Sequence, residues 1–185
     1  MLFRLKFTVA GALVGLLVLA SLGLLLRHLL GNSVPPLVLT VEAARTGLVV
    51  CCAVLLSDAL VHGTLWLLWG KPYRRAYHDL AAVFRGQSAL AILIGALMAG
   101  IGEEMVFRGL STSPWFLFPA AVVFGLLHHL GGSLRGFTLW FVWEGILFAI
   151  AMFVTGELVA TMTAHFLHDL LGFLAFRFEN RSLTT

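Results

Sequence analysis

The stretch SALAILIGALMAGIGEEMVFRGLS, residues 88–111, decides how this chain folds. Its first part is apolar enough for a membrane helix, yet Glu103, Glu104 and Arg108 follow in the same run. An ionisable group at bilayer depth costs between about 2.5 and 17 kcal/mol, depending on how the cost is estimated. The cluster therefore predicts a functional site whose partners lie on neighbouring helices. The structural alternative is a charge cluster at a helix end in the water interface.

The composition predicts a membrane protein. Of the 185 residues, 60% are hydrophobic and 11% are charged, against about 25% charged in ordinary soluble domains. The mean hydropathy is +0.99. The net charge of +3 does not indicate nucleic-acid binding, because no basic run alternates with aromatic residues. Cys51 and Cys52 are adjacent, and we interpret them as small apolar filler rather than as a disulfide or a metal site.

Six apolar runs predict an all-α fold, a polytopic membrane helix bundle of about six transmembrane helices. We expect these helices at residues 7–26, 41–69 or 45–69, 88–111, 115–130, 137–154 and 158–176. The first run is too long for a secretory signal and lacks a small-residue cleavage site after it. We expect residues 70–87 to form a basic loop, since Gly70 and Pro72 interrupt the second run.

The positions of Lys and Arg predict the orientation. With a cytoplasmic amino terminus, nine of the twelve fall on the cytoplasmic side, as the positive-inside rule requires. These nine are Arg4, Lys6, Lys71, Arg74, Arg75, Arg85, Arg135, Arg177 and Arg181. The other three, Arg27, Arg45 and Arg108, fall outside or within the membrane. We therefore expect an integral multi-pass protein of the cell inner membrane, with both termini cytoplasmic.

Polar residues on three predicted helices fall at similar depths. At about 1.5 Å per residue, Glu103 lies about 15 Å from the outer face and His128 about 22 Å from it. His165 and Asp169, four residues apart on one helix face, lie roughly 12 to 18 Å from the outer face. All four fall in the inner part of a hydrocarbon core about 30 Å thick. We therefore expect these side chains to meet.

Such a set can activate water. Burial disfavours the charged form of a carboxylate, so Glu103 can act as a general base near neutral pH. One histidine beside it can orient the water, and a second can stabilise an oxyanion. Arg108 would pair with Glu104 and keep that carboxylate fixed. The alternative is a divalent metal such as zinc. Its ligands would be Glu103, His128, His165 and Asp169.

Three motifs occur in order along the chain: Glu103-Glu104-x-x-x-Arg108, Phe124-x-x-x-His128 and His165-x-x-x-Asp169. Together they resemble the CPBP family of CAAX-prenyl-protease-like intramembrane endopeptidases, also called the Abi family. The resemblance covers residues 88–177 of what we expect to be one transmembrane domain, residues 1–185. It implies hydrolysis of a peptide bond in a membrane-embedded or lipid-attached protein or peptide. Carboxy-terminal processing and protein sorting are roles within the breadth of the family.

The resemblance also implies a role for each motif residue. Glu103 and His128 would activate water, while His165 and Asp169 would support the oxyanion. Glu104 and Arg108 would organise the site. Asp169 stands where a eukaryotic branch of the family has Asn. Since an ionised Asp cannot donate a hydrogen bond, it would be protonated, orient His165 or bind metal. We expect no cofactor, with a divalent metal such as zinc as the alternative.

Two other function classes fit buried carboxylates and histidines. A proton-coupled transporter would use them as a relay, and it requires a polar path to both faces. A catalytically inactive scaffold would keep the fold alone, but all six motif residues are present.

Five further polar or aromatic residues are weighed against the motif residues and mostly assigned structural roles. Glu144, in the fifth apolar run, is a rival site residue. Asp58 and His62 are four apart, and we interpret them as a structural hydrogen-bonded pair. His168 is three residues past His165 and points elsewhere on the helix. Trp140 is interpreted as an interfacial belt residue.

Overall fold

The computed structural model describes residues 8–31, 34–129 and 137–179, and every regular element in these ranges is a helix. The all-α prediction is confirmed. In chain order the elements are α1 (Val9–Leu30), α2 (Val41–Phe84), α3 (Ala89–Leu97), η2 (Met98–Glu103), α4 (Glu104–Phe107), α5 (Pro114–Leu127), α6 (Phe137–Thr155) and α7 (Leu158–Phe178). The basic residues Arg4, Lys6, Arg135 and Arg181 lie outside the described residues.

Five stretches of the described chain are long and apolar enough to cross a membrane. They are α1, α2, residues 89–107, α6 and α7. The fourth predicted helix, residues 115–130, is α5, which is apolar but has 14 residues. Large apolar side chains point outward from the bundle, among them Leu17, Leu67 and Trp115. A soluble protein rarely exposes so much apolar surface, so these side chains face lipid in an integral multi-pass membrane protein.

Hydroxyl side chains mark where the first three helices begin. Thr8 and Ser88 each accept a hydrogen bond from the backbone N–H three residues ahead, at 3.0 and 3.1 Å. Thr40 does the same at the start of α2, at 3.0 Å. These side chains satisfy backbone donors that the first turn of a helix leaves without a partner.

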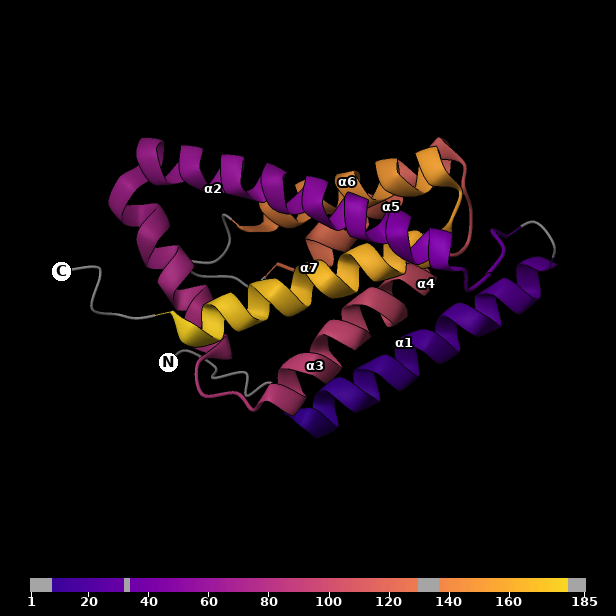
Figure 1. The fold of residues 1–185 in the computed structure, drawn as a ribbon, viewed down its shortest axis with the longest axis horizontal. Coiled ribbons are helices and arrows are strands. Elements are labelled where there is room, and N and C mark those ends of the chain that lie inside the picture. The colour runs from indigo at the N-terminus through magenta and orange to yellow at the C-terminus, as the bar shows by residue number, and fades with distance from the viewer. Residues whose placement is uncertain (1–7, 32–33, 130–136, 180–185) are drawn as a thin grey trace.

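The predicted loop over residues 70–87 is wrong as far as Phe84, because α2 continues past a sharp bend. Gly70 has φ 50° and ψ −123°, a conformation that glycine adopts without steric cost. Pro72 then lies in the first turn of the second half, where its missing N–H is tolerated. This half buries Tyr73, Ala76, Leu80, Ala81 and Phe84. These residues lie on one side of the helix and pack against Phe137 and Phe176 of the bundle. Figure 1 shows the part of α2 beyond its bend running toward the end of α7.

The third predicted helix is also altered, since it ends at Phe107 and contains a π-helical segment, η2. Glycines allow two other helices to pack closely against η2. A Cβ at Gly100 would lie 2.7 Å from the backbone N of Phe166, and one at Gly102 would lie 2.9 Å from Cβ of Leu19. π segments are rare and often occur at functional sites. Here the segment ends on Glu103, directly before Glu104.

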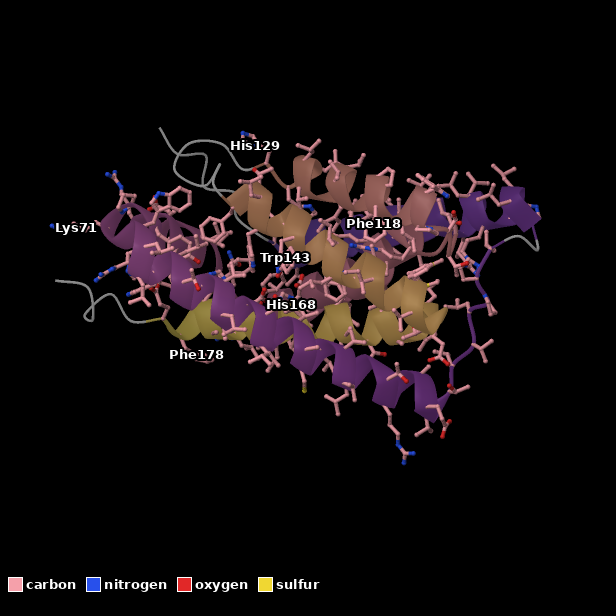
Figure 2. The ribbon with its side chains drawn as sticks, turned by 90° about the horizontal axis from the view of Figure 1, so that it is seen from above. Lys71, Phe118, His129, Trp143, His168 and Phe178 are labelled. Atoms are coloured by element: carbon pink, nitrogen blue, oxygen red, sulfur yellow. The ribbon has the colours of Figure 1, made fainter. Side chains whose placement is uncertain are left out.

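The bundle is built from pairs of helices that bring three distant parts of the chain together. α2 packs along α7, α5 packs along α6, and α1 covers α3, η2 and α4. Figure 1 shows the stretch from α3 to α4 lying between α1 and α7. Buried charged and histidine side chains gather where the pairs meet: Asp58, Glu103, Glu104, Arg108, Glu144, His165 and His168. In Figure 2 His168 lies in the interior, while Lys71 and His129 lie at the periphery.

Close packing of α5 against α6 predicts the effect of one added methyl group. A Cβ at Gly125 would lie 2.5 Å from the backbone N of Val142, so Gly125→Ala should cost about 1–3 kcal/mol of stability. Gly63 is the control, since nothing lies within 4 Å of a Cβ added there. We expect Gly63→Ala to be neutral or slightly stabilising, because Ala favours helix by about 1 kcal/mol. Thermal unfolding in detergent measures both, and equal melting temperatures would contradict the packing.

Candidate active site

A cavity of about 490 Å³ opens inside the bundle and is lined by residues from most of its helices. Its volume is in the usual range for ligand pockets, about 300–1,000 Å³. The ionisable side chains in its wall are Glu103, His128, Glu144, His165, His168 and Asp169. The rest of the wall is mainly apolar and aromatic, for example Met98, Phe124, Phe141 and Phe173. The cavity thus combines a group of ionisable side chains with a mainly apolar lining.

Glu103 and His128 face each other at one side of the cavity. Oε1 of Glu103 lies 3.8 Å from Nε2 of His128, which is too long for a direct hydrogen bond. The Glu103 side chain is 9% exposed and that of His128 is 31% exposed. Two polar atoms at this separation can both reach one water molecule placed between them.

The backbone fixes which nitrogen of His128 faces Glu103. Nδ1 of His128 lies 2.8 Å from the carbonyl oxygen of Phe124, which can only accept a hydrogen bond. Nδ1 therefore carries the hydrogen, and a neutral His128 presents the lone pair of Nε2 to the cavity. His128 is the C-cap of α5, so its position is also fixed by the end of that helix.

Behind the cavity wall, Glu104 joins Arg108 and His165. Oε1 of Glu104 accepts hydrogen bonds from Nη1 of Arg108 at 2.7 Å and from Nδ1 of His165 at 2.8 Å. The second terminal nitrogen of Arg108 donates to the carbonyl oxygen of Gly145 on α6, at 3.0 Å. Glu104 and Arg108 are fully buried. This network connects α4, α6 and α7 and determines which way the His165 ring faces.

Aromatic rings enclose the same network. The Arg108 guanidinium lies 4.9 Å from the centre of the Phe124 ring and 5.6 Å from that of Phe148, within the range of cation–π attraction. Phe148 also stacks on the His165 ring, with ring centres 4.5 Å apart. The rings exclude water from the ion pair and restrict rotation of both cationic and imidazole side chains.

Asp169 lies between two histidines of its own helix. One carboxylate oxygen accepts a hydrogen bond from Nδ1 of His168 at 3.0 Å. The other lies 3.8 Å from Nε2 of His165. Both neighbours present nitrogen, so Asp169 acts here as an acceptor, which suits the orienting role that the sequence left open.

The six predicted site residues thus come together in two layers. Glu103, His128, His165 and Asp169 line the cavity, while Glu104 and Arg108 lie behind it and hold His165. The π segment and the short α4 place the adjacent glutamates in different layers.

The predicted alternative metal set fits the geometry poorly. In the described chain, Asp58, Glu144 and His168 form a group whose ligand atoms all lie within 4.8 Å of one another. The predicted set of Glu103, His128, His165 and Asp169 does not form such a group there. Nε2 of His128 lies 3.8 Å from Glu103, and Nε2 of His165 lies 3.8 Å from Asp169, but in the described chain these two pairs do not come together as one group of ligand atoms. We therefore derive no step through a metal at this position.

Sequence reasoning ranked Asp58, Glu144, His168 and Trp140 too low. Asp58 contacts His168 and accepts a hydrogen bond from Nε1 of Trp140 at 3.2 Å, whereas His62 contacts Tyr73. The expected Asp58–His62 pair and the interfacial Trp140 are therefore corrected. A signal existed, since Trp140 and Glu144 are four residues apart on one helix face.

Comparison with known proteins finds one family model that matches part of the chain. The family model described as type II CAAX prenyl endopeptidase Rce1-like matches residues 85–171. The match contains all six predicted site residues, and it begins one residue after the end of α2. No curated protein and no solved structure matches the chain.

The buried network predicts a large loss of stability when Arg108 is removed. Arg108→Ala leaves the Glu104 carboxylate buried without its cation, which should cost about 3–5 kcal/mol. Arg45 is the control, because its pair with Glu42 is 3.9 Å long and both side chains are 76% exposed. Arg45→Ala should change little, since exposed pairs contribute little. Thermal unfolding in detergent compares the two, and similar losses would contradict the assigned role of Arg108.

Proposed function

We propose, from the premise that residues 85–171 belong to the Rce1-like family of type II CAAX prenyl endopeptidases, that the chain is an intramembrane endopeptidase using glutamate- and histidine-activated water. The observation that carries the mechanism is the pair of Glu103 and His128, which face each other at 3.8 Å in the cavity wall. A carboxylate and an imidazole at that separation can hold one water between them.

In the proposed first step, Glu103 takes a proton from this water and the oxygen attacks the carbonyl carbon of the substrate. His128 accepts a hydrogen bond from the remaining hydrogen of the water through Nε2, because Nδ1–H is bound to the Phe124 carbonyl. Glu103 then gives the proton to the departing amine nitrogen. The C–N bond breaks as the oxyanion collapses to a carboxyl group, and Glu103 returns to its starting carboxylate state.

We assign stabilisation of the oxyanion to His165, which lines the cavity. Its Nδ1–H is held by Glu104, so only Nε2 can face the developing negative charge. To donate from Nε2, the ring must carry both protons. The carboxylates of Glu104 and Asp169 on either side supply the negative charge that such a cation needs. We assign Asp169 to orienting His165 rather than to contacting the oxyanion.

Glu104 and Arg108 are positioning residues in this proposal. They do not line the cavity themselves, and their effect reaches the substrate through the orientation of His165. Preorganised donors are effective because they need not reorient during the reaction.

The apolar wall supports a substrate that is itself apolar near the cleaved bond. Phe84, Met98, Phe173 and Phe176 line the cavity together with the reactive side chains. A membrane-embedded segment or a lipid-bearing chain end presents matching surface. Nothing in the arrangement calls for nucleic acid. Removal of a carboxy-terminal segment during protein sorting is one role of this kind.

The first test compares protein termini in membranes of the native host. Cells expressing Glu103→Gln should lack a small set of termini that wild type produces, measured by quantitative membrane proteomics at equal expression. Loss of a general base lowers rate by about 10²–10⁴-fold, so cleavage of an identified substrate in liposomes should fall by that factor. Glu42→Gln, an exposed carboxylate, is the matched control.

Three outcomes separate the function classes. Cleavage by Glu103→Gln at the wild-type rate would disprove the mechanism. Unchanged termini together with a Glu103-dependent proton flux in liposomes would favour a transporter. Unchanged termini and no proton flux would favour a scaffold if Glu103→Gln also restores whatever growth or sorting defect follows from deleting the gene.

We further propose an inner-membrane location with both termini in the cytoplasm, from the distribution of Lys and Arg. In Figure 1 the end of α7 and the bend of α2 lie toward the left, and the start of α2 lies toward the right. Lys71 and Arg45 are exposed near these opposite ends of the first half of α2.

A cysteine-labelling experiment tests the orientation. In a chain with Cys51 and Cys52 replaced by Ala, Arg45→Cys should react with a membrane-impermeant maleimide on spheroplasts. Lys71→Cys should react only after the membrane is opened. The reverse pattern would mean the opposite orientation.

A further inference from the structure

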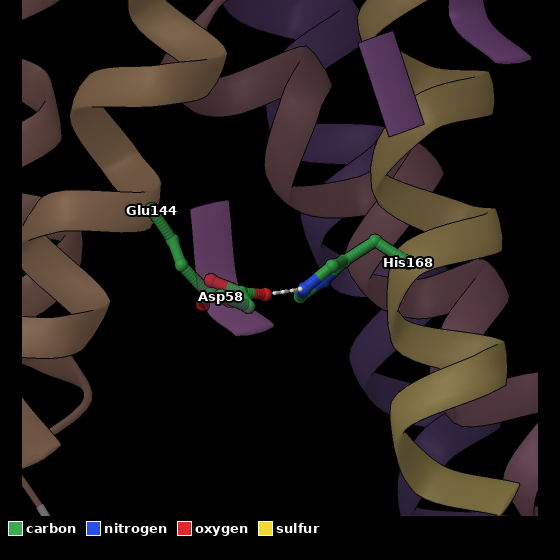
Figure 3. A group of neighbouring side chains, drawn as sticks. All are labelled: Asp58, Glu144 and His168. Carbon is green, nitrogen blue, oxygen red and sulfur yellow. Dashed lines mark hydrogen bonds and ion pairs between the residues drawn. The ribbon is translucent and has the colours of Figure 1, made fainter. Parts of the chain in front are cut away.

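A second buried cluster lies beside the candidate active site and joins three helices. Asp58 comes from α2, Glu144 from α6 and His168 from α7, as Figure 3 shows. Their exposed fractions are 7%, 5% and 6%. Asp58 lies outside the range matched by the Rce1-like family model. The proposed proteolysis uses none of the three.

Both carboxylates of this cluster converge on one ring nitrogen. Oδ2 of Asp58 lies 2.6 Å from Nε2 of His168, and Oε1 of Glu144 lies 3.1 Å from the same nitrogen. One N–H can serve only one of them well. Oε1 of Glu144 is accordingly a buried oxygen without a hydrogen-bond partner. The unsatisfied oxygen points at the place where the other two donor atoms meet.

The opposite edge of the His168 ring carries the partner that a metal-binding histidine requires. Nδ1 of His168 donates to Asp169 Oδ1 at 3.0 Å. A histidine that ligates metal through Nε2 usually donates its other ring N–H to a carboxylate or carbonyl. Asp58 is held in the same way, since Trp140 donates to its other oxygen, Oδ1, at 3.2 Å. Two of the three candidate ligands therefore have outer hydrogen bonds that turn their other donor atom toward the centre of the cluster.

The charge of the cluster also matches one divalent cation. Without a metal, a proton on Nε2 of His168 bridges to Asp58 at 2.6 Å. When an M²⁺ ion takes the place of that proton, Nε2 offers its lone pair while Nδ1–H stays on Asp169. Two carboxylates and a neutral imidazole then carry a charge of −2, which a single M²⁺ ion neutralises.

We propose that Asp58, Glu144 and His168 bind one divalent transition-metal ion of the zinc type, at a site separate from the Glu103–His128 pair. Histidine nitrogen and carboxylate oxygen are ordinary zinc ligands, and three protein ligands leave a fourth position for water. The donor atoms already lie within 4.8 Å of one another. Glu144 and His168 border the cavity, which provides a route of entry for the ion.

Such an ion would clamp α2 to α6 and α7 and hold Nδ1–H of His168 on Asp169. Asp169 in turn lies 3.8 Å from Nε2 of His165. The ion would thus support the proposed active site through a positioning chain, without contacting substrate. The inference does not rest on the proposed proteolysis, because metal binding is measured without it.

The experiment uses the full chain in detergent, stripped with EDTA and equilibrated with micromolar Zn²⁺. Elemental analysis should find one zinc per wild-type chain. Asp58→Asn and Glu144→Gln should each reduce binding by at least about tenfold, since each removes a charged ligand. Glu103→Gln is the matched control, a buried carboxylate in the same cavity wall, and it should keep its zinc. Zinc should raise the melting temperature of wild type and Glu103→Gln but not of the two ligand variants.

Co²⁺ provides a second measurement in case the ligand variants do not fold. The His168→Cys variant keeps a ligand at that position but should add a sulfur-to-cobalt charge-transfer band that wild type lacks. Absence of the band in folded, cobalt-loaded His168→Cys would overturn the assignment. So would a wild-type chain that binds no zinc at micromolar concentration. Zinc that is lost in Glu103→Gln and kept in both Asp58→Asn and Glu144→Gln would place the metal at the candidate active site instead.

Discussion

The structure depends on a fully buried ion pair. Arg108 and Glu104 lie one helical turn apart and meet at 2.7 Å with no exposed surface. Buried charges are tolerated only when they are paired and hydrogen-bonded, and here Gly145 and His165 add one hydrogen bond to each partner. Because these partners lie on α6 and α7, the cost of burying the pair is offset only when the helices dock correctly. The same requirement orients His165 toward the cavity.

Close helix packing makes this network possible. In a bilayer, helices associate mainly through van der Waals contact and hydrogen bonds, and small residues at their interfaces let backbones approach. Gly100 and Gly125 supply this in η2 and α5, where an added Cβ would overlap Phe166 or Val142. The π segment then places Glu103 at the cavity and Glu104 behind it. Packing and chemistry are therefore specified by the same few residues.

Two groups of carboxylates and histidines lie side by side and meet at Asp169, and the second group borders the cavity through Glu144 and His168. One group contains Glu103, His128 and His165, and the other is Asp58, Glu144 and His168. Asp169 accepts from His168 and lies 3.8 Å from His165. A change in the second group would therefore reach the first through a single carboxylate. The part of the fold matched by the Rce1-like family model holds the first group, whereas Asp58 is supplied by α2, outside that match.

The sequence by itself determined the all-α membrane bundle, the approximate helices and the motif residues, because apolar runs and helical spacing are local signals. It missed the helix beyond Gly70, since a glycine and a proline predict a break without telling whether a new helix follows. Tertiary structure alone decided that His168 turns toward Asp58 and Glu144 rather than toward lipid. The distance between α2 and α7 follows from packing of side chains far apart in the chain, and no local pattern encodes it.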